Sequence, residues 1–337
     1  MDALIPQGPV VAPLIYFVLF NASSLIMIWG LGRMEKRGLE GTALGTLVMP
    51  YCSGLSNLIF AGQMGVEGAS NGTLVLENCL VNNATNLTLL IGLPALIWGM
   101  QILPKTNTKG KKAKAKQQVQ EVHHLNRLSL LLTLTAGLFF TGAFWAVAGD
   151  GTLTRRESFM LIGLFLFWQV FQIFDVMKYN VVKKQKQGFA IALDFLIVVA
   201  GGYLMFGSID WLVSWIVGMG DEFIGRGGLG WLSGWLMVLP NAFLAFYYSF
   251  KKRSDIAYSS QVGDGHICIP LCLGVYGLFV ESSQLNLPSF DLCLAVISGS
   301  LIIHIAFVLT IGRLPRWMGL LLVASYGFFV FNGLIGL

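Results

Sequence analysis

The chain has 337 residues, of which 55% are apolar and only 12% are charged, and its formal net charge is +5. A soluble domain carries about 25% charged residues, so this composition excludes an ordinary soluble globular protein. The basic residues lie in short clusters between apolar runs rather than along one face, which excludes a nucleic-acid-binding protein.

Long apolar runs follow one another along the whole chain. About 20 apolar residues are enough to cross a bilayer as a helix. Ten runs are predicted as transmembrane helices, at residues 10–33, 43–64, 72–103, 126–148, 156–178, 188–217, 229–250, 255–280, 290–312 and 316–336. The third run is long enough to be tilted or broken. The sequence therefore predicts an all-α integral membrane protein with ten transmembrane helices in a lipid bilayer.

The distribution of lysine and arginine predicts how these helices are oriented. If the loops alternate between the two sides of the membrane, 19 of the 22 basic residues fall on one side. Basic loops stay in the cytoplasm, so we expect both termini to lie outside. No basic segment precedes the first apolar run, and we expect no cleavable signal peptide. The short chain without an added regulatory domain indicates a multi-pass protein of a prokaryotic inner (plasma) membrane.

The basic segments divide the chain into two halves. Residues 1–178 hold five predicted helices and a long basic cytoplasmic loop at 104–125, residues 179–187 form a cytoplasmic linker, and residues 188–337 hold the other five helices. Because five is an odd number, the second half enters the membrane from the opposite side. This is the pattern of an inverted-topology repeat, and such transporters hold their substrate near mid-membrane between the repeats.

The first half carries a polar stretch inside its second and third helices. The second helix holds Ser53 and Asn57, and the third holds Asn78, Asn82 and Asn86. These three asparagines recur every four residues and therefore share one helical face. Such a face can hydrogen-bond to neighbouring helices or bind a dehydrated cation. We favour cation binding, because polar groups inside a membrane span are costly and three amides share this face.

The second half carries a corresponding polar stretch. Asn241 follows a proline inside an apolar run, and the next helix holds Ser260, Asp264 and Cys268. Asp264 lies nine residues into that helix, about 13 Å along it at 1.5 Å per residue. An acid at this depth is the strongest single functional candidate. The alternative is a protonated or hydrogen-bonded packing acid.

The remaining polar residues give weaker indications. Glu77 lies near the outer end of the third helix and is a secondary candidate, and His304 is expected to pack or to hydrogen-bond within the ninth helix. All five cysteines lie in or beside apolar runs, so we expect no disulfide framework and no zinc site. Four scattered histidines and the lack of HExxH and GxSxG motifs predict that the protein is not an enzyme. We expect no cofactor and no metal other than a transported cation.

The two polar stretches resemble the repeats of the calcium/cation antiporter superfamily, which includes the sodium/calcium exchangers. Each repeat of that family has a Ser/Thr-Ser-x-Pro-Glu pattern on one helix and a Gly-Asn-x-x-Gly-Ser-Asn-x-x-Asn-like pattern on the next. The resembling segments are 53–57 (SGLSN), 77–86 (ENCLVNNATN), 239–241 (LPN), 254–257 (SDIA) and 259–265 (SSQVGDG). The resemblance implies ten helices in two inverted halves, secondary antiport by alternating access, and a cation as the transported partner.

The chain departs from the family pattern at the calcium-binding positions, which identifies it as a divergent member. The hallmark glutamate of the two repeats is replaced by Asn57 and Asn241. A hard divalent ion wants several oxygen ligands and usually more than one carboxylate. With Asp264 as its one acid, the site suits one monovalent cation or one proton better than Ca²⁺.

We therefore expect a cation antiporter in which Asp264 exchanges cation and proton. The expected ion-binding residues are Ser53, Asn57, Asn82, Asn86, Asn241, Asp264 and Cys268, with Glu77 and Ser260 as secondary candidates. Na⁺, Ca²⁺, H⁺ and other cations all stay open as substrates. Two alternatives also stay open: a non-transporting sensor or assembly protein on the same fold, and a transporter of a different small solute.

Overall fold

The protein is almost entirely helical. A computed structural model describes residues 11–36, 49–103, 113–183, 190–218, 226–286 and 290–335. The helices are α1 (Val11–Lys36), α3 (Met49–Glu67), α4 (Gly72–Ala84), α5 (Ile91–Trp98), α6 (Ala113–Val147), α7 (Arg155–Lys183), α8 (Ala190–Gly218), α9 (Arg226–Phe250), α10 (Ser254–His266), α11 (Leu273–Phe279), α12 (Asp291–Thr310) and α13 (Arg316–Val330). Three π-helical segments are η4 (Thr85–Leu90), η6 (Ile267–Cys272) and η8 (Phe331–Ile335), and η3 (Ala69–Asn71) is a short 3-10 turn.

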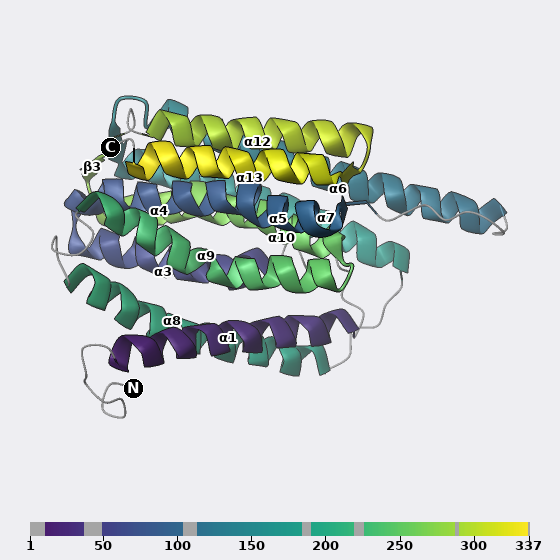
Figure 1. The fold of residues 1–337 in the computed structure, drawn as a ribbon, viewed down its shortest axis with the longest axis horizontal. Coiled ribbons are helices and arrows are strands. Elements are labelled where there is room, and N and C mark those ends of the chain that lie inside the picture. The colour runs from purple at the N-terminus through teal and green to yellow at the C-terminus, as the bar shows by residue number, and fades with distance from the viewer. Residues whose placement is uncertain are drawn as a thin grey trace.

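The helices run side by side along the long axis of the molecule (Figure 1). Within the described ranges, eight helical spans are long and apolar enough to cross a membrane. The helices α3 and α13 lie alongside those spans but are not among the eight. The multi-pass membrane fold is therefore confirmed, whereas the count of ten transmembrane helices stays a prediction.

The packing of the helices leaves a buried centre. Helices α1 and α8 pack chiefly against each other along one edge of the bundle, while α6 packs on α12 and α13 packs on α5 at the opposite edge (Figure 1). The helices α3, α4, α9 and α10 contact one another between these edges. Apolar side chains bury against lipid or against each other in such a bundle, so polar groups at its centre must find partners inside the protein.

Two expected loop regions are partly helical. Helix α6 begins at Ala113, within the stretch 104–125 that the sequence predicted as a loop, and its first part projects beyond the bundle (Figure 1). Helix α7 likewise continues to Lys183, into the predicted linker 179–187. Lysine, glutamine and alanine are good helix formers, so these polar segments extend the neighbouring apolar helices instead of ending them. Residues 104–112 and 184–189 lie outside the described ranges.

The long run predicted at 72–103 is helical from Gly72 to Trp98 through a π-helical segment, and this segment has a counterpart in the second half. Helix α4 passes at Thr85 into the π segment η4, and helix α10 passes at Ile267 into the π segment η6. The starts of α4, η4 and α5 precede those of α10, η6 and α11 by 182 residues each. The same spacing separates Asn82 from Asp264 and Asn86 from Cys268. π-Helical turns occur often at functional sites, and here each one begins three residues after one of these two buried polar residues, Asn82 and Asp264.

Two short antiparallel strand pairs join the first half of the chain to the second. Strand β1 (Met100–Gln101) pairs with β4 (Arg313–Leu314), with Met100 opposite Leu314. Strand β2 (Thr152–Thr154) pairs with β3 (Ser282–Gln284), with Thr152 opposite Gln284. Each pair therefore ties a helix connection of one half to a helix connection of the other.

Candidate ion-binding site

Asp264 is the centre of a buried polar cluster. It lies near the end of α10, three residues before η6 begins at Ile267, and it is 0% exposed. Its Oδ2 accepts hydrogen bonds from the amide nitrogens of Asn86, at 2.7 Å, and of Asn241, at 2.9 Å. The carboxylate therefore contacts side chains from α9 and from the π segment of the first half.

The first half contributes two of the predicted asparagines to this cluster. The amide nitrogen of Asn86 lies 2.7 Å from Oδ1 of Asn82, in addition to its bond with Asp264. Both asparagines are 0% exposed. The predicted face of α4 therefore points to the acid of the other half, and one amide links the two.

Two further groups border the carboxylate. The thiol of Cys268 lies 4.0 Å from Oδ2 of Asp264, one helical turn later. On the other side, a Cβ added at Gly54 of α3 would lie 3.1 Å from Oδ1 of Asp264. The glycine therefore lets the backbone of α3 approach the carboxylate closely.

A hydrogen bond from α10 to its backbone holds Asn241 in place. Gln261 donates through Nε2 to the backbone oxygen of Asn241, at 3.2 Å, and to the hydroxyl of Ser260, at 3.1 Å. Ser260 in turn donates to the backbone oxygen of Ala257, at 3.0 Å. Ser260 thus supports the cluster through Gln261, and no hydrogen bond joins it to the carboxylate of Asp264.

Two predicted residues, Asn57 and Glu77, make no hydrogen bond to this network among the described residues. Asn57 is fully buried one turn beyond Gly54 on α3, but neither its oxygen nor its nitrogen has a hydrogen-bond partner among the described residues. Glu77 lies against Gly230 and Trp231 of α9, away from the carboxylate of Asp264. The backbone of Ser53 lies on α3, and its side chain is outside the described part of the structure.

The cluster has unused oxygen ligands. Among the described residues, the side-chain oxygens of Asn57, Asn86 and Asn241 are buried and without a hydrogen-bond partner. Buried polar atoms are nearly always satisfied, so such a group of carbonyl oxygens beside one carboxylate suits a dehydrated cation. Rotation of an asparagine side chain about its Cβ–Cγ bond exchanges the positions of its NH₂ group and its oxygen. Asn86 and Asn241 can therefore donate to a bare carboxylate in one orientation and coordinate a bound cation in the other.

Sequence reasoning missed two contributors to the site. Gly54 lies inside the 53–57 segment, and Gln261 lies inside the polar run of α10, so both had a local signal. Their roles depend on contacts with other helices, which that signal does not contain. His304 behaves as expected, because its Nε2 lies 2.9 Å from the backbone oxygen of Leu87 in η4.

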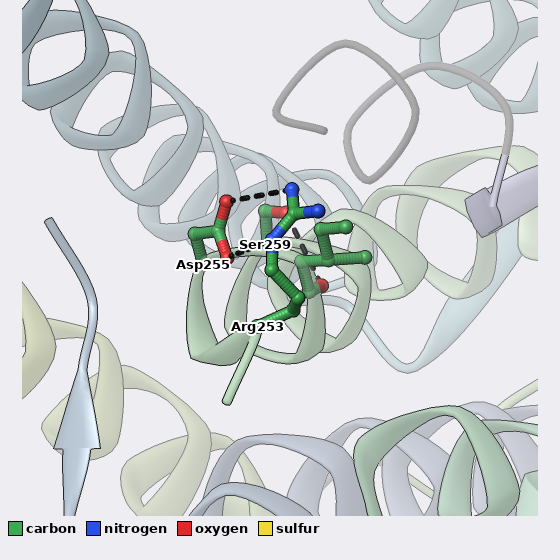
Figure 2. A network of polar contacts seen from close by, with 4 residues as sticks. Arg253, Asp255 and Ser259 are labelled. Atoms are coloured by element: carbon green, nitrogen blue, oxygen red, sulfur yellow. Dashed lines mark hydrogen bonds and ion pairs between the residues drawn. The ribbon is translucent and has the colours of Figure 1, made fainter. Parts of the chain in front are cut away.

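The start of α10 carries a separate polar network (Figure 2). Arg253 Nε lies 3.2 Å from Oδ1 of Asp255, and the hydroxyl of Ser259 donates to the backbone oxygen of Ile256 at 3.3 Å. The two charged side chains are 39% and 31% exposed, respectively. This ion pair orders the beginning of the helix and contributes little net free energy, as is usual for exposed pairs.

Family comparison agrees with this geometry. The sequence model described as sodium/calcium exchanger protein matches residues 9–174 and 189–334. The chain belongs to the sodium/calcium exchanger family. Members of this family are secondary transporters rather than enzymes, so the chain is a cation antiporter of the sodium/calcium exchanger type.

Solved structures of one sodium–calcium exchanger, NCX_Mj, have a similar fold. The structure soaked with 2.5 mM Na⁺ and 10 mM Sr²⁺ aligns with a TM-score of 0.69 at 15% identity, over 95% of this chain and 97% of that chain. The structure soaked with zero Na⁺ and Ca²⁺ aligns with a TM-score of 0.65 at 17% identity, over 95% and 98% of the two chains. At this identity the likeness establishes the shared fold. Comparison with curated proteins gives no match.

Proposed function

We propose that this exchanger-family protein moves a monovalent cation in exchange for a proton, and that both bind at Asp264. The observation that carries the proposal is the buried carboxylate of Asp264, which contacts neutral amides of both halves. Cation and proton compete for the same oxygen atoms, and this competition couples their fluxes.

Charge favours a monovalent cation over Ca²⁺ at this cluster. Two hydrogen-bonded partners of Asp264 are Asn86 and Asn241, which supply carbonyl oxygens but no charge. A divalent cation beside one carboxylate would keep an uncompensated positive charge in a low-dielectric site. One Na⁺, or one proton, leaves the cluster neutral.

The proposed site extends beyond the hydrogen-bonded core of the cluster. Asn57, whose two amide atoms have no hydrogen-bond partner among the described residues, would supply a further ligand from α3. Asn82 holds Asn86 in place, Cys268 borders the carboxylate, and Ser53 belongs to the proposed site through its place on α3.

Alternating access about a site between two inverted five-helix repeats is the transport mechanism that we propose. The 182-residue correspondence of α4, η4 and α5 with α10, η6 and α11 supports it. The positions of the first and last helices also support it, because α1 begins at the same end of the bundle at which α13 ends (Figure 1). With ten transmembrane helices, the excess of basic residues on one side puts that end outside the cell.

Flux measured in proteoliposomes tests the role of Asp264. Radioactive Na⁺, K⁺ and Ca²⁺ are offered one at a time against a pH gradient, with wild-type protein and with the Asp264→Asn variant. We expect a monovalent cation to move in exchange for protons and the variant to lose that exchange. Asp255→Asn is the matched control, because it makes the same change at the exposed start of the same helix. Unchanged exchange in Asp264→Asn would refute the assignment.

Binding measurements separate a transporter from a sensor on the same fold. Calorimetry with Na⁺, K⁺, Ca²⁺, Mg²⁺ and Mn²⁺ shows which ions bind and whether Asn57→Ala removes that binding. Saturable binding with no flux in wild-type vesicles would support a sensor and contradict the proposed transport.

A further inference from the structure

A second buried carboxylate, Glu77, lies in the half of the bundle where α4 begins. It is the sixth residue of α4, about 7 Å from the helix start at 1.5 Å per residue. The side chain is 6% exposed, whereas Asp264 is 0% exposed. Glu77 therefore lies closer to the end of the bundle where α4 begins, and a small part of the residue is accessible from outside the protein.

The surroundings of Glu77 are built to receive a carboxylate. The backbone N–H of Gly230 and the indole N–H of Trp231 donate hydrogen bonds to it. A Cβ added at Gly230 would overlap the carboxylate, so only a glycine leaves room for Glu77 at this step of α9. The carboxylate of Glu77 thus occupies the space that the absence of a side chain at Gly230 leaves, beside two hydrogen-bond donors.

The donors at Glu77 differ chemically from those at Asp264. An asparagine amide can present either its NH₂ or its oxygen to a neighbour, whereas a backbone N–H and an indole N–H are donors only. Asp264 accepts hydrogen bonds from two amides that can present either atom, whereas Glu77 accepts hydrogen bonds from two groups that can only donate. A metal cation at Glu77 would face two N–H groups in place of oxygen ligands, whereas a proton needs only one carboxylate oxygen.

No charged side chain among the described residues neutralises the carboxylate of Glu77. Among the described side chains, no cation forms an ion pair with Glu77, and the nearby titratable group is the thiol of Cys293 on α12. Arg226 begins α9 four residues before Gly230, and its side chain is outside the described part of the structure. A buried carboxylate with neutral partners is costly as an anion, so it takes up a proton readily.

The seam between α4 and α9 connects Glu77 to the ion-binding cluster. Asn78, next to Glu77, donates to the hydroxyl of Ser233 at 3.1 Å, one turn beyond Gly230 on α9. The same face of α9 continues to Asn241, which donates to Asp264. At the position 182 residues after Glu77, the second half has Ser259. The first half therefore has a buried acid at this position, and the second half has a hydroxyl group at the equivalent position.

We propose that Glu77 is a proton-only site on the α4–α9 seam, separate from the cation-binding carboxylate of Asp264. This inference rests on the proposed function for its role in transport, where it makes exchange sensitive to the pH at the end where α4 begins. The proton comes from the aqueous phase at that end and binds a carboxylate oxygen of Glu77.

Infrared difference spectroscopy of the purified protein tests this site without any transport. A protonated carboxyl group has a C=O stretching band that an ionised one lacks, so a pH titration follows each acid. We expect one band component to disappear in Glu77→Gln and another in Asp264→Asn. Added Na⁺ should remove the Asp264 component and leave the Glu77 component unchanged. Loss of the Glu77 component on addition of Na⁺ would overturn the proposal.

Flux in vesicles of one orientation gives the second readout. Acidifying the compartment at the end where α4 begins should change radioactive Na⁺ flux several-fold in wild type, and Glu77→Gln should remove this one-sided effect. Na⁺ binding at alkaline pH should stay unchanged in that variant. Glu67→Gln is the matched control, because it makes the same change at an exposed site at the end of α3.

Each outcome separates this inference from the proposed function. A one-sided pH effect that persists in Glu77→Gln, or loss of Na⁺ binding in that variant, contradicts the proton-only site alone. Absence of any wild-type flux contradicts the proposed transport, and the infrared titration still decides whether Glu77 binds a proton. If Glu77→Gln does not fold, Trp231→Phe removes one fixed donor, and an unchanged Glu77 titration in that variant overturns the proposal.

Discussion

Asn82 and Asp264 occupy equivalent positions, 182 residues apart, in the two helices that pass into π segments. The amide nitrogen of Asn86 lies 2.7 Å from a side-chain oxygen of each of them. One half places a neutral amide at this step and the other half places a carboxylate. Asn86 therefore joins two equivalent positions, one with a neutral amide and the other with a carboxyl group.

Restoring carboxylates should change which cation the protein prefers. The double variant Asn57→Glu/Asn241→Glu puts acids at the two positions where the family has its hallmark glutamates. Because Ca²⁺ affinity rises with the number of charged ligands, we expect Ca²⁺ binding relative to Na⁺ to increase by at least about tenfold, which corresponds to 1.4 kcal/mol. Calorimetric titration with each ion measures this change.

The control for that variant is Asn57→Gln/Asn241→Gln, which adds the same chain length without the charge. An equal increase in relative Ca²⁺ binding in both double variants would show that size, and not charge, sets the preference.

The close approach of α3 to Asp264 predicts a strong effect of a single methyl group. In Gly54→Ala the new Cβ would lie 2.7 Å from Cγ2 of Ile267 and 3.1 Å from Oδ1 of Asp264. Overpacking of this kind costs about 1–3 kcal/mol of folding free energy. We expect a lower melting temperature together with a weaker affinity for the transported cation, because Asp264 must move.

Gly62→Ala is the matched control on the same helix. Its new Cβ would meet Cγ1 of Val275 at 3.9 Å, an ordinary contact. Melting curves and cation binding should stay at wild-type values in this variant. Equal losses in the two variants would show that alanine is poorly tolerated along α3 in general, and would remove the special role of Gly54.

The hydrogen bond between His304 and the π segment η4 should contribute measurable stability. His304→Phe keeps an aromatic ring but leaves the backbone oxygen of Leu87 without its 2.9 Å partner. An unsatisfied buried acceptor costs about 1–3 kcal/mol, so we expect a reduced free energy of unfolding, measured by denaturant titration in detergent.

His124→Phe serves as the comparison for that variant, because His124 lies on the exposed part of α6. A loss of stability as large in His124→Phe would mean that the added phenyl group, and not the lost hydrogen bond, causes the effect.

Several features of this protein follow from the sequence alone. Membrane insertion follows from the lengths of the apolar runs. The asparagine face of α4 and the depth of Asp264 in its helix follow from counting residues along regular helices. These properties are local, so a single chain segment is enough to predict them.

The tertiary structure decided which of these residues meet. Asn86 and Asp264 are 178 residues apart, and their contact depends on how α4, α9 and α10 pack. Helix packing likewise placed Glu77 against Gly230 and Trp231, and it left both amide atoms of Asn57 without partners among the residues that the structure describes. The periodicity of one helix sets the direction of a side chain from its own axis. The group that it meets is set by the neighbouring helix, whose position depends on the apolar packing of the whole bundle.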